Sequence, residues 1–355
     1  MQILDETIST ISPQSDTWRA RARERLGQLT MPHWALGKIL DLAVDLAGMT
    51  RSLQFATLRK VVIVMAADHG VVVEGVSKYP QEVTWQMVAN FVHGGAGINA
   101  LAGQSGADVR VVDMGVARDL DHLARTNAIL SLPVAPGTAN IAEGPAMTRE
   151  QAVIAVQNGI QVARRFIDDE KYDLIGVGEM GIGNTTPSSA IITALSGESA
   201  EATTGYGTGI DDEQRHHKIA VIERALRVNR PDPRDGLDVL AKLGGFEIGG
   251  IAGVILGAAA RKRPVLVDGL ISSAGALIAQ QLAPHATDYL IAAHRGVEKG
   301  HGIALGRLGK EPLLDLRLRL GEGTGAALAM NLVEAAGCVL KEVRTFAEAE
   351  VSSDA

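Results

Sequence analysis

The stretch from Asp173 to Pro187 reads DLIGVGEMGIGNTTP and joins a short apolar run to a long glycine-rich turn. The run Asp173 to Val177 is nearly all apolar, which is typical of a strand buried in a parallel sheet. Pro187 marks the start of the next helix, because proline suits the first helical position. Strand, turn and helix in this order predict one βα unit of an α/β domain.

The same alternation of short apolar runs and longer helical patterns extends over residues 60–293. It is typical of βαβ units around a parallel sheet. We expect helices over Arg149 to Asp168, where Thr148 and Gln151 fit a capping box, and over Asp212 to Val228. The other expected strands are Lys60 to Ala66, Asp108 to Met114, Pro264 to Val267 and Asp288 to Ala292.

The two ends of the chain have helical patterns without intervening strands. We therefore expect residues 1–54 and 326–355 to form a small helical domain, beside a large α/β domain of residues 55–325. The single Cys338 excludes disulfides within the chain. It lies in an apolar helical run, which predicts a buried, inert thiol.

Composition narrows the class of protein. Of the 355 residues, 46% are hydrophobic and 21% are charged, which is typical of a globular protein with a sizeable core. The net charge is −7 without a basic cluster, so we do not expect a nucleic-acid partner. The first residues lack the basic and apolar regions of a signal peptide. The apolar stretch Gly249 to Ala260 is far short of the ~20 residues that span a bilayer. The sequence therefore predicts a soluble cytoplasmic protein.

Three expected strands run directly into turns with polar residues, at Ala67 to Gly70, Gly176 to Pro187 and Val267 to Gly269. In open α/β sheets, ligands bind outside the carboxyl ends of the strands. These three turns are therefore expected to line one cleft.

The second turn contains the spacing G-x-G-x-x-G at Gly176, Gly178 and Gly181. A dinucleotide site would need its last glycine at the start of a helix and an acid about 20 residues later, at the end of the next strand. Glu198 lies in a Ser-Gly-Glu-Ser turn instead, which argues against a dinucleotide oxidoreductase. Two interpretations remain: a purely structural turn, or a cradle of amides and hydroxyls for one phosphate, which would include Asn184 and Thr185.

Residues Leu320 to Gly325 read LGEGTG and place Glu322 among three glycines, just before a helix. Glu322 is either a charge that the helix dipole favours or a general base on a backbone that a ligand can approach closely. His69 and His294 each follow an expected strand, where a hydrogen-bonded structural role is favoured over catalysis. The spacing of His, Cys and carboxylates predicts no metal site.

Five motifs, in this order, resemble the nicotinate-nucleotide:dimethylbenzimidazole phosphoribosyltransferases of cobamide assembly. The resemblance covers about residues 20–340. Its motifs are Ala66 to Gly70 (AADHG), Gly178 to Pro187 (GEMGIGNTTP), Asn229 to Gly236 (NRPDPRDG), Leu243 to Glu247 (LGGFE) and Arg319 to Leu328 (RLGEGTGAAL).

The resemblance implies a Rossmann-like, three-layer large domain, a small helical domain and a homodimer. It implies transfer of ribose phosphate from nicotinate mononucleotide to a benzimidazole-type base without a cofactor, with Glu322 as the catalytic base. The family's ribose and phosphate contacts correspond to Glu179, Gly181, Gly207, Lys218 and Gly269. Its acceptor pocket corresponds to Tyr79, Met87, Met180 and Leu320.

The chain departs from the family in two places. Where the family usually reads KPPGSLG, residues Met31 to Gly37 read MPHWALG. Some members have serine at the position of Tyr79 and glutamine at that of Met87, so the pocket here is expected to be more apolar. The alternatives are another acceptor, such as a different benzimidazole, a purine or a phenol, and a non-catalytic nucleotide-binding paralogue.

Overall fold

A single sheet of six parallel strands organises the part of the chain that the computed structural model describes, residues 2–55 and 59–352. The strand order β3-β2-β1-β4-β5-β6 is that of a doubly wound Rossmann arrangement, as expected. The strands are β1 (Lys60–Ala67), β2 (Ala107–Gly115), β3 (Leu130–Ser131), β4 (Leu174–Met180), β5 (Val265–Val267) and β6 (Leu290–Ala292).

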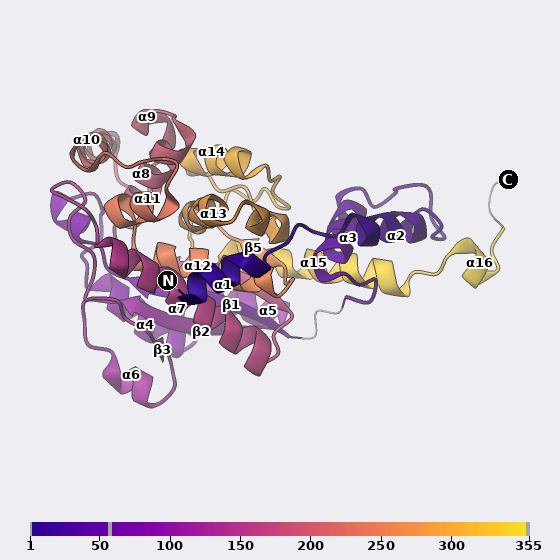
Figure 1. The fold of residues 1–355 in the computed structure, drawn as a ribbon. Helices are drawn as coiled ribbons and strands as arrows, with labels where there is room; N and C mark the ends of the chain where they lie inside the picture. The colour runs from indigo at the N-terminus through magenta and orange to yellow at the C-terminus, as the bar shows by residue number, and fades with distance from the viewer. Residues whose placement is uncertain (1, 56–58, 353–355) are drawn as a thin grey trace.

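Helices surround this sheet in the larger part of the molecule, as Figure 1 shows. All eight residues of β1 are buried, so both faces of the sheet are covered at its centre. The helices of this part are α1 (Gln2–Thr10), α4 (Val83–Val92), α5 (Gly97–Ser105), α6 (Asp121–Arg125), α7 (Arg149–Arg164), α8 (Thr185–Ser196), α9 (Ala200–Thr203), α10 (Asp212–Asn229), α11 (Gly236–Leu243), α12 (Phe246–Ala260), α13 (Leu270–Leu282), α14 (Lys299–Leu308) and α15 (Thr324–Glu342).

Further helices form a lobe that projects from this body (Figure 1). It contains α2 (Asp16–Leu26), α3 (Lys38–Thr50), the far end of α15 and α16 (Phe346–Ala349). Helices α2 and α15 pack against α3, and an isolated β-bridge joins Leu29 to Thr345. Helix α1 instead packs against α7 and α12 of the large part. The division into domains at residues 55 and 325 stays a prediction.

Most expected elements are present, with shifted ends. Thr148 and Gln151 form the expected capping box, and α7 continues as a short π-helix to Asp169. The expectation that Pro187 opens its helix is wrong, because α8 begins at Thr185. Proline is tolerated in the first turn, where the amides have no partner within the helix. The two-residue strand β3 is too short to give a pattern in the sequence.

The expectation of a buried Cys338 is also wrong, because its side chain is exposed. The buried face of α15 holds Met330, Val333 and Leu340, and Cys338 lies off that face. The apolar run in the sequence therefore predicted more buried surface on this helix than the structure has.

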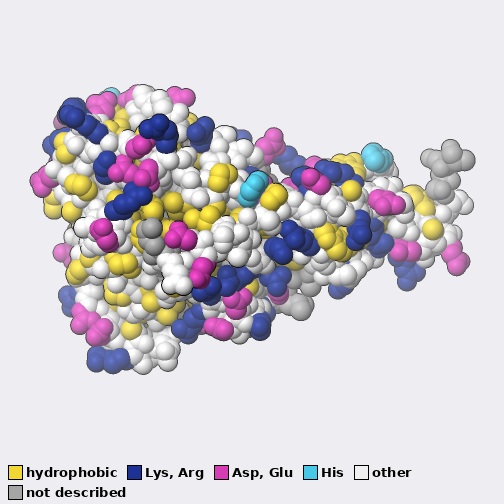
Figure 2. Space-filling model, in the orientation of Figure 1, with side chains coloured by type: hydrophobic (Ala, Val, Ile, Leu, Met, Phe, Trp, Pro, Cys, Tyr) yellow, Lys and Arg dark blue, Asp and Glu magenta, His cyan; other side chains and the backbone are white. Residues whose placement is uncertain are grey.

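Charged side chains of both signs are intermixed over the face of the molecule that Figure 2 shows. No helix in the described ranges combines the length and apolar character that crossing a membrane requires.

The contact between α7 and α12 explains part of the glycine content. A Cβ atom added at Gly253 would overlap the backbone carbonyl of Val156, and one added at Gly159 would overlap that of Gly250. Backbones that touch in this way leave no room for a side chain. The glycines therefore set the distance between two helices that cover the sheet.

We predict that Gly253→Ala lowers the free energy of unfolding by about 1–3 kcal/mol, because the two helices must separate. The matched control is Gly103→Ala in α5, where an added Cβ meets nothing within 4 Å. That change should be neutral or stabilise by about 0.5–1 kcal/mol, because alanine favours the helix. Denaturant unfolding measures both, and equal effects of the two changes would contradict this account of the packing.

Candidate active site

Buried polar residues gather where four neighbouring strands end. Asp68 and His69 follow β1, Glu179 lies near the end of β4, Asp268 follows β5 and His294 lies two residues after β6. Each of these side chains is at most 7% exposed. Because parallel strands end at the same edge of the sheet, the three turns that were expected to line a cleft lie at this edge.

Glu322 lies in the loop that leads into α15, on a backbone that few residues adopt. The φ angles of Gly321, Glu322 and Gly323 are +83°, +62° and +89°. The side chain of Glu322 is 7% exposed, and its Oε2 accepts a hydrogen bond of 3.1 Å from the amide of Ile98 at the start of α5.

The surroundings of Glu322 change its acidity. Burial raises the pKa of Glu322; the Ile98 amide opposes this effect and the charge of Asp268 adds to it. A carboxylate with a raised pKa is a stronger base than an exposed glutamate, provided that the pH lies above that pKa.

Glu179 lies beside this loop. Its Oε2 accepts a hydrogen bond from the side-chain amide of Asn184, and its carboxyl group packs against Gly321. Burial raises the pKa of Glu179 to about 8, against the opposing effect of the Asn184 hydrogen bond. This shift favours the protonated carboxyl group, which can donate a hydrogen bond to a hydroxyl oxygen.

Lys218 of α10 lies at the start of α8. Its Nζ donates a hydrogen bond of 2.5 Å to Thr185 Oγ1, and Gly207, with φ +50°, lies against both groups. Burial lowers the pKa of Lys218 to about 8, and the charge of Glu298 partly opposes this. A cation, a hydroxyl group and the amides of a helix N-terminus are the groups that bind a phosphate.

The other expected donor contacts lie along the same edge. A Cβ atom at Gly181 would overlap the Ala67 carbonyl, so this turn lies directly on the end of β1. Gly269 is the N-cap residue of α13, and a Cβ atom added there would lie 4.0 Å from the His294 ring.

The expected acceptor residues are less closely joined. Leu320 is 59% exposed and contacts Gly97, next to the Glu322 carboxylate. Met180 is half-buried and ends β4. Tyr79 is 52% exposed, and Met87 is half-buried on α4. No recorded contact of the described residues joins either side chain to Glu322, so the acceptor pocket stays a prediction.

The sequence indicated no role for two carboxylates of this region, those of Asp268 and Glu298. Asp268 accepts hydrogen bonds from the amides of Gly323, Gly325 and Ala326. Its signal in the sequence is its place directly after a strand, in a turn expected to line the cleft. Glu298 Oε1 accepts a hydrogen bond of 2.9 Å from the amide of Gly207. No pattern in the sequence joins two residues so far apart.

The histidines at this edge have buried carboxylate partners. His69 Nε2 lies 2.8 Å from Glu247 Oε1, and His294 Nε2 lies 3.5 Å from Asp268 Oδ1. Across the described ranges, no three or more His, Cys, Asp or Glu side chains are placed together so that they could hold a metal ion.

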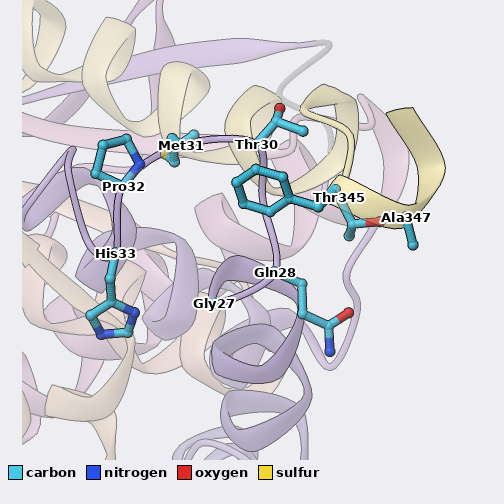
Figure 3. A pocket seen from close by; sticks show the side chains of 9 residues that line it. Gly27, Gln28, Thr30, Met31, Pro32, His33, Thr345 and Ala347 are labelled. Carbon is cyan, nitrogen blue, oxygen red and sulfur yellow. The ribbon is translucent and has the colours of Figure 1, made fainter. Parts of the chain in front are cut away.

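A separate pocket of about 820 Å³ lies in the helical lobe. Figure 3 shows it between residues 27–33 and the segment Thr345–Ala347. Its wall includes Met31, Pro32 and His33, which begin the segment that departs from the family pattern. None of its lining residues belongs to the expected substrate site.

Comparisons with known proteins identify the family of this chain. A phosphoribosyltransferase family model, DBI_PRT, matches residues 11–351. The nicotinate-nucleotide–dimethylbenzimidazole phosphoribosyltransferase of Syntrophotalea carbinolica is 61% identical over 352 residues, and that of Desulfotalea psychrophila is 54% identical over 354 residues. Both matches cover 99% of each chain.

A comparison with solved structures leads to the same family. A crystal structure of CobT from Thermus thermophilus superposes with a TM-score of 0.91 at 46% identity, over 95% of this chain and 100% of that one. The family that the five motifs indicated is therefore confirmed, over nearly the whole length of the chain. The chain belongs to the nicotinate-nucleotide–dimethylbenzimidazole phosphoribosyltransferase family.

Proposed function

We propose that this chain transfers the phosphoribosyl group of nicotinate mononucleotide to 5,6-dimethylbenzimidazole or a related base, with Glu322 as the catalytic base. The products are the α-ribazole 5′-phosphate and nicotinate, in the assembly of the cobalamin nucleotide loop. The observation that carries the proposal is the buried Glu322 carboxylate on its left-handed loop, at the sheet edge that also holds the Lys218 cation.

The reaction needs one base. The pyridine-like nitrogen of the acceptor forms a bond to C1′ while the bond from C1′ to the pyridinium nitrogen breaks, and its electron pair returns to the nicotinate ring. The adduct would be cationic unless its other nitrogen lost a proton, which Glu322 accepts. Such general base catalysis typically contributes 10²–10⁴-fold. Attack on the face opposite the leaving ring inverts C1′ and gives an α-riboside.

In this proposal, the donor is held through its phosphate and through its ribose. Lys218 and Thr185, with Gly207 against both groups, lie at the proposed position of the phosphate, together with the turns at Gly181 and Gly269. The protonated Glu179, oriented by Asn184, donates a hydrogen bond to a ribose hydroxyl. Fixing C1′ in this way lowers the barrier because the reacting atoms need not find each other by diffusion.

The acceptor lies on the other side of C1′ in this proposal. Met180, Leu320, Met87 and Tyr79 enclose the flat ring, and their apolar surfaces exclude water from the reacting nitrogen. We further propose a homodimer that works in the cytoplasm, and light scattering of the purified protein measures its mass.

Release of nicotinate tests the activity itself. The protein is incubated with nicotinate mononucleotide and dimethylbenzimidazole, and nicotinate and the riboside are quantified. A non-catalytic nucleotide-binding paralogue would release neither, and a different acceptor preference would become visible when benzimidazoles, purines and phenols are compared.

We predict that Glu322→Gln, which keeps the size of the side chain but removes its basicity, lowers kcat at least about 100-fold with little change in the donor KM. In the wild type, kcat should fall as the pH drops through the raised pKa of Glu322, because the protonated carboxyl group accepts no proton. The exposed Glu342→Gln at the end of α15 is the control and should leave kcat unchanged. Near-normal turnover of Glu322→Gln would refute its role as base.

We predict that Lys218→Ala raises the donor KM, because a cation on the phosphate acts in the ground state and the transition state alike. In the wild type, kcat/KM for the donor should fall above pH 8, where the lysine of the free enzyme loses its charge. This decline should be shallower in Lys218→Ala, where only the loss of the Glu179 proton remains, and unchanged in the exposed control Lys341→Ala. An unchanged KM would remove Lys218 from the phosphate site.

We predict that dimethylbenzimidazole is preferred clearly over adenine but only modestly over benzimidazole. A pocket without polar partners penalises a polar base, whereas extra methyl groups gain only about 1–3 kcal/mol. Met87→Gln should narrow the gap to adenine and leave the donor KM unchanged. The bases are supplied together and each α-riboside is quantified. A ratio that Met87→Gln does not alter would exclude Met87 from acceptor choice.

A further inference from the structure

The start of α15 is held by a side chain from another part of the chain. Its N-cap residue, Gly323, has no side chain to accept a hydrogen bond from the first amides of the helix. Asp268 does so instead: Oδ1 accepts from Gly325 at 2.7 Å and from Ala326 at 3.1 Å, and Oδ2 accepts from Gly323 at 3.3 Å. Asp268 is 1% exposed, so water cannot replace these bonds without a rearrangement.

These bonds start at the residue after Glu322. Glu322 has a left-handed backbone, and a non-glycine residue keeps this conformation only where its surroundings impose it. Gly178 of β4 lies directly against the Glu322 carbonyl, and Ile98 donates to its carboxylate. Asp268 fixes the following amide, so the loop is held on three sides.

We propose that Asp268 is a positioning residue for the transfer reaction: by binding the N-terminus of α15, it fixes the direction in which Glu322 presents its carboxylate to the acceptor. The inference rests on the proposed role of Glu322 as base. Asp268 itself does not touch the reacting atoms in this proposal, and its effect on the rate passes through Glu322.

His294 supports Asp268 from the next strand. Its Nε2 lies 3.5 Å from Asp268 Oδ1, and its ring packs so closely on Gly325 that an added Cβ there would overlap it. Burial opposes protonation of His294, but the Asp268 carboxylate raises the pKa of His294 overall. Around Glu322, the titratable groups of the neighbouring elements are Glu179 near the end of β4 and Asp268 after β5, and His294 contacts Asp268.

Two substitutions separate the charge of Asp268 from the position of its side-chain oxygens. Asp268→Asn keeps one oxygen for the helix amides but removes the charge that helps to raise the pKa of Glu322. We expect kcat to fall at least about tenfold, the donor KM to stay within about twofold, and the acidic limb of the kcat profile to move to lower pH. Asp268→Glu keeps the charge but displaces the carboxylate, so kcat should fall while the limb stays in place.

Asp113→Asn is the matched control. Asp113 is also a buried carboxylate at the end of a strand, and its Oδ1 accepts hydrogen bonds of 2.9 Å from the amides of Gly115 and Val116. Asp113→Asn should lower the melting temperature, as Asp268→Asn should, but it should leave kcat and the dependence of kcat on pH unchanged. Equal losses of kcat in Asp113→Asn and Asp268→Asn would reduce Asp268 to a stabilising residue and overturn the proposal.

A double-mutant cycle completes the test. If Asp268 acts through Glu322, adding Asp268→Asn to Glu322→Gln should change single-turnover rates less than about twofold. A loss as large as in the wild-type background, or a kcat near normal in folded Asp268→Asn, would overturn the inference. Failure of the proposed function looks different, because then the wild type releases no nicotinate or Glu322→Gln keeps its activity. If Asp268→Asn does not fold, Asp268→Glu gives the same comparison.

Discussion

The direct contact between two backbones fixes the geometry of the whole sheet edge. Gly178 lies in β4, Glu322 lies just before α15, and a Cβ atom at residue 178 would overlap the Glu322 carbonyl. The two segments can approach so closely only because β4 has no side chain at this point. Val62 of β1 also lies against Gly323, so the loop follows the surface of the two central strands. From there α15 runs outward and ends in the helical lobe.

The charges at this edge suit a reaction in which positive charge is present at the start. Burial raises the pKa of both Glu179 and Glu322, and the charge of Asp268 adds to this effect in each. A cluster of acids would be costly on its own, because like charges in a poorly solvated place disfavour ionisation. A pyridinium donor brings a cation among them, whereas Lys218 lies apart, at the start of α8, where an anionic phosphate would bind. The distribution of charge thus matches the two ends of the proposed donor.

The sequence predicted the sheet and the edge that carries the site, because apolar runs and glycine turns are local patterns. It also predicted that the turn containing Glu179 lies at this edge, whereas only the resemblance joined Glu322 to the site and supplied the roles of both residues. It missed the hydrogen bonds that Asp268 accepts from the start of α15 and the one that Glu298 accepts from Gly207, since each joins residues far apart in the chain. It placed the start of α8 two residues late, because proline is tolerated throughout the first turn of a helix. It placed Cys338 in the interior, because an apolar run does not determine which face of a helix is covered.

The conformation of Glu322 raises the question of why this loop does not relax. A non-glycine residue in the left-handed region costs on the order of 1–3 kcal/mol, and burial of its carboxylate adds to that cost. Each hydrogen bond to a charged group contributes about 1.5–3 kcal/mol. Asp268 and Glu322 together accept four such bonds from backbone amides around the loop. These bonds oppose the strain and hold a functional carboxylate in a conformation that its own backbone disfavours.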